Sequence, residues 1–161
     1  MTSLKEVFGL NEVKFSDSEL EDLFLLQHDK SHTGSNGGKI SGLEKALKAL
    51  SQVSTKDLFR GLTKKPQNLS VGKHLTLDNY SSFSEHESVA KQFATQYKSN
   101  TMLKLSNGKG FNYAGWLIGE MEKLRKSDPQ SFEDGDGDFT IQSTKEEAEW
   151  ILPQRSIFKV Q

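Results

Sequence analysis

Residues 146–153 read EEAEWILP, two spaced carboxylates followed by an apolar segment that ends at a proline. We expect a β-strand over residues 147–152, in which Glu147 and Glu149 point to the same face because side chains i and i+2 of a strand share a face. Two carboxylates held side by side repel each other, so a purely structural strand gains little from them. Such a pair suits a reaction with a cationic transition state and a proton to remove from a nucleophile.

Working outward from this stretch, the rest of the chain predicts a mixture of short strands and helices. Residues 153–155 are expected to turn the chain so that a last strand, 156–160, forms a hairpin-like pair with 147–152. Further strands are expected at 57–62, 74–77 and 101–105. Capping boxes predict helices beginning at Ser16 with Glu19, Ser41 with Glu44, and Ser84 with Glu87, and apolar spacing predicts a fourth helix over 113–125.

Two polar stretches, 31–38 and 127–144, are expected to be loops because they are rich in Gly, Ser and Asp. We see no linker in the 161 residues and expect a single domain, with a helical N-terminal part over 1–54 and a catalytic core over 55–161. Since the first 50 residues are helical and the remainder mixes both elements, the expected fold class is α+β.

Composition excludes several classes of function. The chain has no Cys, which removes disulfides, thiolate metal sites and Cys nucleophiles. No apolar run is long enough for a membrane span, and the N-terminus lacks the apolar core of a secretory signal, so we expect a cytoplasmic protein without membrane contact, including the cytoplasm of an infected or intoxicated host cell. The net charge of −1 argues against broad nucleic-acid binding.

The charges are nevertheless unevenly distributed along the chain. Residues 30–77 carry nine Lys or Arg against two acids, whereas residues 128–149 carry eight Asp or Glu against one Lys. These blocks are either two solvated faces or surfaces that attract a phosphate-rich ligand and a cationic one. The sequence DGDGD (134–138) resembles the start of a calcium loop, but Phe139 and Lys145 stand where Gly and Glu are required, so we assign no metal.

Two other features accompany the paired carboxylates. Arg60 lies inside the apolar segment 58–62, where a charge is costly unless it meets an anion. The sequence Ser-Phe-Ser at 82–84 lies at an expected strand-to-helix junction. Each feature also has an ordinary structural explanation: a strand-edge Arg paired with Asp57, a helix N-cap at Ser84, and an exposed strand face for the two Glu.

An Arg on an early strand, then Ser-x-Ser, then Glu-x-Glu before an apolar strand resembles the Arg–Ser–Glu class of mono-ADP-ribosyltransferases, which includes phage enzymes that modify host proteins and binary toxins. The similarity extends over about residues 58–160, and its specificity lies in the order and spacing of motifs that are individually common. The resemblance implies a split β-sandwich of two small sheets with an N-terminal helical region. It implies transfer of ADP-ribose from NAD to a target protein.

The resemblance also implies roles for the catalytic residues. Arg60 matches the Arg that holds the NAD phosphates, and Ser82 matches the first Ser of the motif, which orients the catalytic Glu. Glu149 matches that catalytic Glu, which binds the nicotinamide ribose and stabilises its cation. Glu147 matches the upstream Glu that positions the acceptor, and Glu at that place is typical of members that modify Arg.

Three further residues are implied to contact NAD. Gly61 matches the residue whose backbone clamps the nicotinamide amide, Phe93 matches an aromatic that packs on the nicotinamide, and Asn79 matches a polar contact. The chain departs from the pattern at Phe83, where Thr is commoner. It departs again at Gln96, where binary toxins have a second phosphate-binding Arg; Lys64, Lys65 and Lys91 are the candidates to replace it.

Three alternatives to the favoured function remain open. The chain could be an NAD glycohydrolase on the same fold, a nucleic-acid ADP-ribosyltransferase, which the charge does not favour, or a member that only binds a partner. The favoured reading is an Arg-specific transferase, a monomer, with the acidic residues 133–138 drawing in a basic target protein. We also expect residues 1–50 to form a cap over the NAD site.

Overall fold

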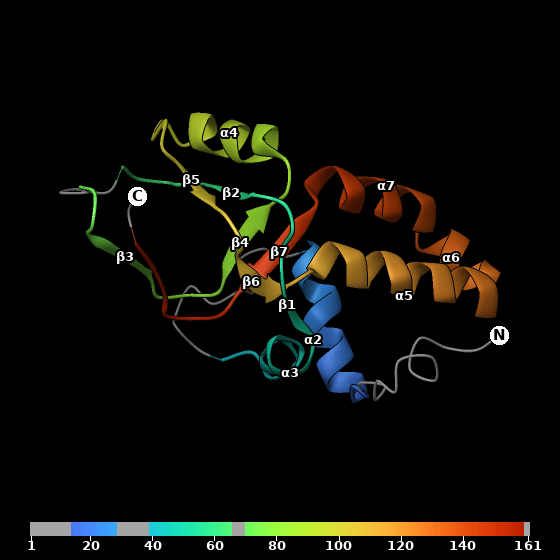
Figure 1. Cartoon of the computed structure of the whole chain (residues 1–161). Coiled ribbons are helices and arrows are strands. Elements are labelled where there is room, and N and C mark those ends of the chain that lie inside the picture. The colour runs from blue at the N-terminus through green and yellow to red at the C-terminus, as the bar shows by residue number, and fades with distance from the viewer. Residues whose placement is uncertain (1–13, 29–38, 66–69, 160–161) are drawn as a thin grey trace.

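The computed structural model describes residues 14–28, 39–65 and 70–159 (Figure 1), and the expected polar loop at 31–38 lies outside them. The described residues form a mixed α+β fold, as the sequence predicts. The helices are α2 (Asp17–His28), α3 (Ser41–Leu50), α4 (Glu87–Gln96), α5 (Tyr113–Ser127), α6 (Pro129–Asp134) and α7 (Gly137–Glu147). The strands are β1 (Ser51–Val53), β2 (Leu58–Gly61), β3 (His74–Leu77), β4 (Ser81–Ser84), β5 (Met102–Leu105), β6 (Lys109–Phe111), β7 (Glu149–Leu152) and β8 (Ser156–Lys159).

The strands form two antiparallel sheets. The larger sheet has the order β1-β6-β7-β4-β2-β5, and the smaller one pairs β3 with β8. The expected hairpin of residues 147–152 with 156–160 is therefore wrong, because the chain crosses from one sheet to the other between β7 and β8. Strands β1 and β6 were not expected, since three residues are too few for a clear alternation.

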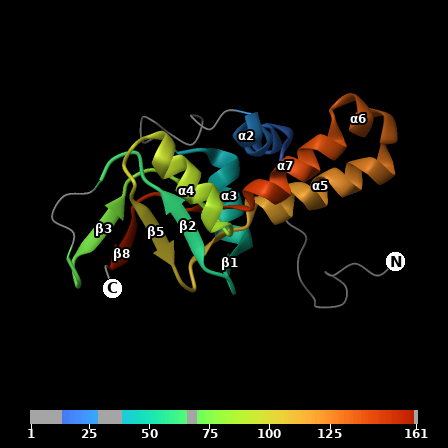
Figure 2. The ribbon, with the colours of Figure 1, turned by 90° about the horizontal axis from the view of Figure 1, so that it is seen from above.

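The two faces of the larger sheet carry different partners. Leu58, Phe83 and Trp150 lie on one face in an apolar cluster with Leu77 of β3 and Phe158 of β8, so the small sheet packs there. Cross-strand pairs share a face, and Phe59, Ser84 and Glu149 therefore lie on the other face. On that side α4 lies over β2 and β5 (Figure 2), and a second apolar cluster joins β6 and β7 to α2, α3 and α5.

The N-terminal helices are held to each other and to the sheet by named contacts. The capping box at Ser16 is confirmed, because the Ser16 hydroxyl accepts from Glu19 N and the Glu19 carboxylate accepts from Ser16 N. The box expected at Ser41 is wrong: α3 has Ile40 at its N-cap without a side-chain cap. Its intended partner Glu44 instead accepts a hydrogen bond from the Tyr80 hydroxyl.

Residues 127–144 are not a loop, which corrects the sequence prediction. They form α6 and α7, which pack on α5 as an arm extending from the sheet (Figure 1). Asp128 caps α6 by accepting from Ser131 N, with Pro129 in the first turn. Phe132 is buried beneath Gly137, where a Cβ would lie 2.2 Å from its ring. One buried aromatic and its close-packed Gly thus hold a segment whose composition indicates a loop.

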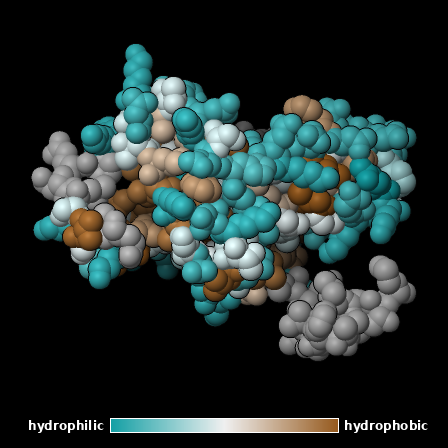
Figure 3. All heavy atoms as spheres, turned by 45° about the horizontal axis from the view of Figure 1, so that its top comes forward, coloured by the Kyte–Doolittle hydropathy of each residue, from teal (hydrophilic) through white to brown (hydrophobic). Residues whose placement is uncertain are grey.

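Hydrophilic residues cover most of the face of the arm that Figure 3 shows. Arg125 of α5 bonds Asp138 of α7 at 2.6 Å and lies over the Phe132 ring, which ties the arm together. Phe139 is an exception to the polar surface, with 74% of its area exposed. No helix within residues 14–28, 39–65 and 70–159 is both long and apolar enough to cross a membrane.

Candidate active site

A cleft of about 360 Å³ opens on the larger sheet beneath α4. It brings together six of the seven residues singled out from the sequence: Arg60, Gly61, Ser82, Phe93, Glu147 and Glu149. The remaining lining residues are Phe59, Tyr80, Phe83, Ser84, Val89 and Ala90. Residues 89 chain positions apart therefore meet in one hollow.

Ser82 and Glu149 form the centre of the cleft. Their strands are paired, with Ser82 opposite Ile151 and Ser84 opposite Glu149. The Ser82 hydroxyl donates a hydrogen bond of 2.5 Å to Oε2 of Glu149, whose residue is only 6% exposed. A buried carboxylate is costly unless it is hydrogen-bonded, and this bond also restricts its rotamer. The arrangement presents a fixed negative charge to whatever occupies the cleft.

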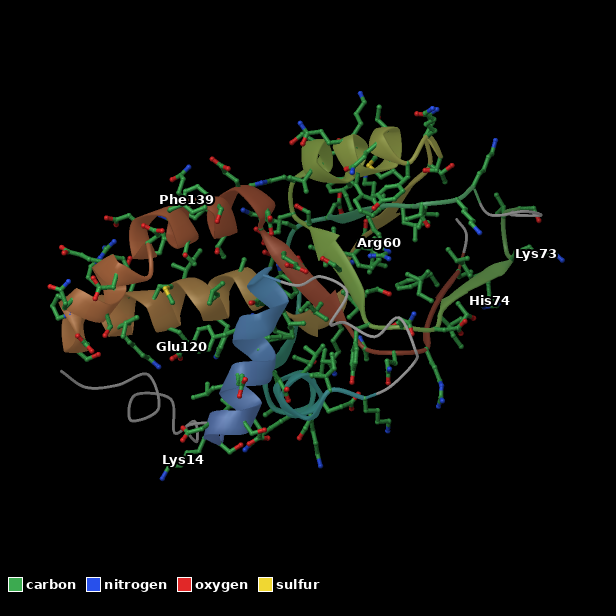
Figure 4. The ribbon with its side chains drawn as sticks, turned by 180° about the vertical axis from the view of Figure 1, so that it is seen from behind. Lys14, Arg60, Lys73, His74, Glu120 and Phe139 are labelled. Atoms are coloured by element: carbon green, nitrogen blue, oxygen red, sulfur yellow. The ribbon has the colours of Figure 1, made fainter. Side chains whose placement is uncertain are left out.

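Arg60 supplies the opposite charge. Its side chain lies in the angle between β2 and β4 (Figure 4), and Nη1 donates to the Ser82 carbonyl oxygen at 2.9 Å. Burial lowers the pKa of Arg60 from its ordinary value, and the charge of Glu149 opposes that shift. Among the described residues its buried Nε has no hydrogen-bond partner. A half-buried cation whose buried Nε is an unused donor has the chemistry of an anion site.

The angle between β2 and β4 arises from their pairing. The register of these strands is the single pair Phe59–Ser84, whereas β2 pairs with β5 along its whole length. Leu62 N donates to the Thr101 carbonyl, so the alternation of an antiparallel ladder turns the peptide groups of Gly61 away from β5 and toward β4. The strands diverge at that point (Figure 1), and the Arg60 guanidinium bonds the Ser82 carbonyl across the opening.

Glu147 does not share a strand face with Glu149, and this part of the sequence prediction is wrong. Glu147 is the last residue of α7, Ala148 has left-handed backbone angles (φ 43°, ψ 51°), and the strand begins only at Glu149. A left-handed residue after a helix C-terminus reverses the chain direction. Both carboxylates nevertheless line the cleft, so the pair is brought together by a helix-to-strand turn and not by strand alternation.

The segment that follows β4 holds this turn in place. The Ser84 hydroxyl donates to the Glu147 carbonyl at 2.6 Å, and Glu85 N donates to the Ala148 carbonyl at 3.1 Å. His86 Nδ1 lies 2.7 Å from the Glu146 carbonyl oxygen. The predicted capping box at Ser84 is therefore wrong: Ser84 ends β4, the N-cap of α4 is His86, and the Ser84 hydroxyl serves the C-terminus of α7.

The aromatic and polar candidates fare differently. Phe93 of α4 lines the cleft, is 37% exposed and contacts the Tyr97 ring with centroids 4.7 Å apart. Asn79 is exposed and does not line the cleft; its carbonyl accepts a hydrogen bond from the Ser81 hydroxyl. The candidate lysines Lys64, Lys65 and Lys91 are exposed and do not line it either.

Tyr80 is the principal lining residue that the sequence analysis missed. It lies two positions before Ser82, and strand alternation from Ser82 could have placed it on the same face. Burial raises its pKa to about 12, and its hydrogen bond to Glu44 adds to the shift. Burial also raises the pKa of Tyr113, the first residue of α5, and the charges of Glu149 and Glu147 contribute.

The expected N-terminal cap is not seen in the described part of that region. No described residue of 14–28 or 39–50 lines the cleft, and Glu44 of α3 contacts the hydroxyl of the lining residue Tyr80. Within the described residues, no group of three or more His, Cys, Asp or Glu side chains is arranged to hold a metal ion.

Comparison with known proteins adds no relative to this description of the site. No protein-family model, no curated protein and no solved structure matched it in the three comparisons that were made.

Proposed function

We propose that the protein is a mono-ADP-ribosyltransferase that moves ADP-ribose from NAD to an Arg side chain of a target protein and releases nicotinamide. The observation that carries the proposal is the hydrogen bond from Ser82 to the buried Glu149 carboxylate, in a cleft that Arg60 also lines. A carboxylate fixed by a hydrogen bond, in the same cleft as a half-buried guanidinium, fits a substrate that has both a developing cation and phosphates.

The proposal assigns each part of NAD to a group of the cleft. Its pyrophosphate binds the Arg60 guanidinium, whose buried Nε lacks a protein partner among the described residues. The nicotinamide lies against the Phe93 ring, and its amide bonds the peptide groups of Gly61, which point to the open side of β2. The proposal assigns no NAD contact to Asn79.

The reaction begins with cleavage of the bond between C1′ of the ribose and N1 of nicotinamide. Both electrons of this bond pass to the nitrogen, so nicotinamide leaves neutral and the ribosyl ring becomes cationic. Glu149 stabilises that cation electrostatically. A guanidinium nitrogen of the target then attacks C1′, and its proton passes to the Glu147 carboxylate.

An Arg acceptor is supported by the position of Glu147 and by the charge of the arm. Glu147 lines the same cleft from the end of α7, and a cationic acceptor that enters along the arm meets this carboxylate at the mouth of the site. Four exposed acids precede it: Glu133 and Asp134 on α6, Asp136 at the N-cap of α7, and Asp138 on α7. A negative approach surface attracts a basic target and disfavours a nucleic acid.

The first test measures nicotinamide release from NAD by the native chain and by Glu149→Gln, which keeps the side-chain volume and removes the charge. We expect a loss of at least about 100-fold, as for removal of a principal transition-state contact. Glu146→Gln is the matched control, because its exposed carboxylate bonds only Gln142 on the helix surface, and it should retain native turnover. Equal rates in the native chain and Glu149→Gln would refute the role of Glu149.

The second test separates transfer from hydrolysis with Glu147→Gln. If Glu147 serves the acceptor alone, this variant continues to hydrolyse NAD within about threefold of the native rate but no longer labels Arg in a host lysate. Mass spectrometry of the lysate gives the acceptor. Label released only to water points to a glycohydrolase, label on RNA or DNA to a nucleic-acid transferase, and no NAD turnover to a partner-binding protein.

A further inference from the structure

Tyr80 joins the cleft to the N-terminal helices. Its ring lines the cleft and is 4% exposed. Its hydroxyl accepts from Ile40 N at 3.1 Å and donates to Oε1 of Glu44 at 2.5 Å. The chain passes from Tyr80 directly into β4, so Ser82 follows only two residues later.

The helix that holds the Tyr80 hydroxyl is itself firmly placed. Gly42 N donates to the Asp22 carboxylate at 3.1 Å, and a Cβ at Gly42 would lie 2.3 Å from the Glu19 carbonyl oxygen, so α3 and α2 are in backbone contact. Lys45 bonds Glu19 at 3.2 Å. Leu43, Ala46 and Leu47 of α3 are buried in the core. The α2–α3 pair is thus a rigid support for whatever bonds to it.

The start of β4 needs such a support. β7 pairs with β4 over Ser81–Ser84, but on its other side β4 meets β2 only at Ser84. At Ser81 and Ser82 the strand therefore has one strand neighbour instead of two, although its Ser82 hydroxyl must hold Glu149. Opening the sheet creates room for a ligand and removes strand pairing from the same two residues, where the Arg60 side chain bonds the Ser82 carbonyl in place of a strand backbone.

We propose that Tyr80 is a positioning residue, whose hydrogen bonds to Glu44 and Ile40 replace the missing strand neighbour and keep Ser82 in register to orient Glu149. The inference rests on the proposed function for its kinetic consequence, but the restraint on β4 is a structural property that can be measured without NAD. It gives the N-terminal helices a role in catalysis although none of their described residues lines the cleft.

The experiment compares Tyr80→Phe with Tyr113→Phe. Both remove a buried hydroxyl from the same apolar cluster; that of Tyr113 donates to the Leu23 carbonyl at 2.8 Å and does not line the cleft. We expect Tyr80→Phe to lower kcat for nicotinamide release by about 100-fold, as for small displacements of a catalytic group, with KM for NAD changed less than about threefold. Tyr113→Phe should keep kcat within about threefold of native.

Removal of the other partner gives an independent check. Glu44 does not line the cleft, yet Glu44→Ala should reduce kcat in the same way as Tyr80→Phe. The double variant should be no worse than either single variant, because residues that act as one unit are not additive. Additive losses, or equal kcat in Tyr80→Phe and Tyr113→Phe, would overturn the inference.

Hydrogen exchange of the Ser81–Ser84 amides supplies the readout without NAD. These amides should exchange faster in Tyr80→Phe and Glu44→Ala than in Tyr113→Phe at matched stability. Unchanged exchange overturns the positioning role, whatever the kinetics. Faster exchange in a chain that has no NAD turnover even in its native form upholds the restraint and refutes the proposed function instead.

Discussion

At the scale of single residues, Gly61 borders the opening between β2 and β4 and also packs closely against α4. Its peptide groups face the opening between β2 and β4, which suits contact with a ligand. Its missing side chain, however, is required by the protein itself, because a Cβ there would lie 2.2 Å from the Ala90 carbonyl oxygen and 2.7 Å from Ala94 N. Both atoms belong to the backbone of α4, which covers the cleft and carries Phe93. The identity of this residue is explained by packing alone.

We therefore predict that Gly61→Ala destabilises the fold by about 1–3 kcal/mol, the usual cost of forcing extra volume into a packed contact. Gly119→Ala is the matched control: no atom lies within 4 Å of a Cβ at Gly119 in α5, and Ala is the better helix former by roughly 0.5–1 kcal/mol. Thermal unfolding should show opposite shifts in Tm. A Gly61→Ala variant as stable as the native chain would mean that α4 does not approach β2 so closely.

At the scale of elements, the residues proposed to be catalytic lie at or near the ends of helices and strands. Glu147 is the last residue of α7, and Glu149 is the first residue of β7. Ser82 lies in the part of β4 that pairs with one strand instead of two. Such ends depend on side-chain hydrogen bonds, as the bond from Ser84 to the Glu147 carbonyl illustrates. The same is true of the helix α2, whose first turn supports α3 and, through α3, Tyr80.

This dependence predicts a pH effect at Glu19. Hydrogen bonds from Ser16 N and from Lys45 lower the pKa of Glu19 below its ordinary value of 4.5. Because the folded pKa lies below the unfolded one, the stabilisation is fully present above about pH 4.5 and is lost as the pH falls through the folded pKa. Urea unfolding between about pH 5 and pH 3 should therefore lose stability more steeply in the native chain than in Glu19→Gln. Glu21→Gln, an exposed site on the same helix, should keep the native slope.

At the scale of the whole molecule, charge is divided between the arm, counted here as α5, α6 and α7, and the rest of the chain. Residues 113–147 carry nine acidic against four basic residues, a net charge of −5, while all other residues together carry 17 basic against 13 acidic, a net charge of +4. The arm joins the sheet at Glu147, beside the cleft. The acidic surface of the arm therefore borders a cleft that contains the half-buried guanidinium of Arg60.

The triple variant Glu133→Gln, Asp134→Asn and Asp136→Asn changes the net charge of residues 113–147 from −5 to −2. We predict that it reduces kcat/KM for a basic protein acceptor by about tenfold at low salt. The effect should fade at about 1 M salt, because exposed charges are screened there. NAD hydrolysis should not change. The triple Asp17→Asn, Glu21→Gln and Asp78→Asn removes as many exposed charges elsewhere, and an equal loss in it would show that net charge alone is responsible.

Much of this molecule follows from local sequence. The Ser16 capping box, the helix from Tyr113 and the apolar strand after Glu149 are encoded by neighbouring residues, because caps and apolar periodicity act over a few positions. The order of Arg60, Ser82, Glu147 and Glu149 likewise pointed to residues that share a cleft. These predictions needed no knowledge of which elements pack together.

Other features were decided only by tertiary contacts. Ser84 looks like a helix cap but bonds the end of α7, residues 127–144 look like a loop but fold over buried Phe132, and Tyr80 looks unremarkable but ties the cleft to α3. Ser84 and Tyr80 bond partners that lie tens of residues away, and Phe132 packs against Gly137 of the next helix, so a tertiary contact outweighs local preference in each case. The chemical groups of the site could therefore be identified from the order of residues along the chain. Packing between distant segments sets their arrangement, through the turn at Ala148, the single pair between β2 and β4, and the hydrogen bond from Tyr80 to Glu44.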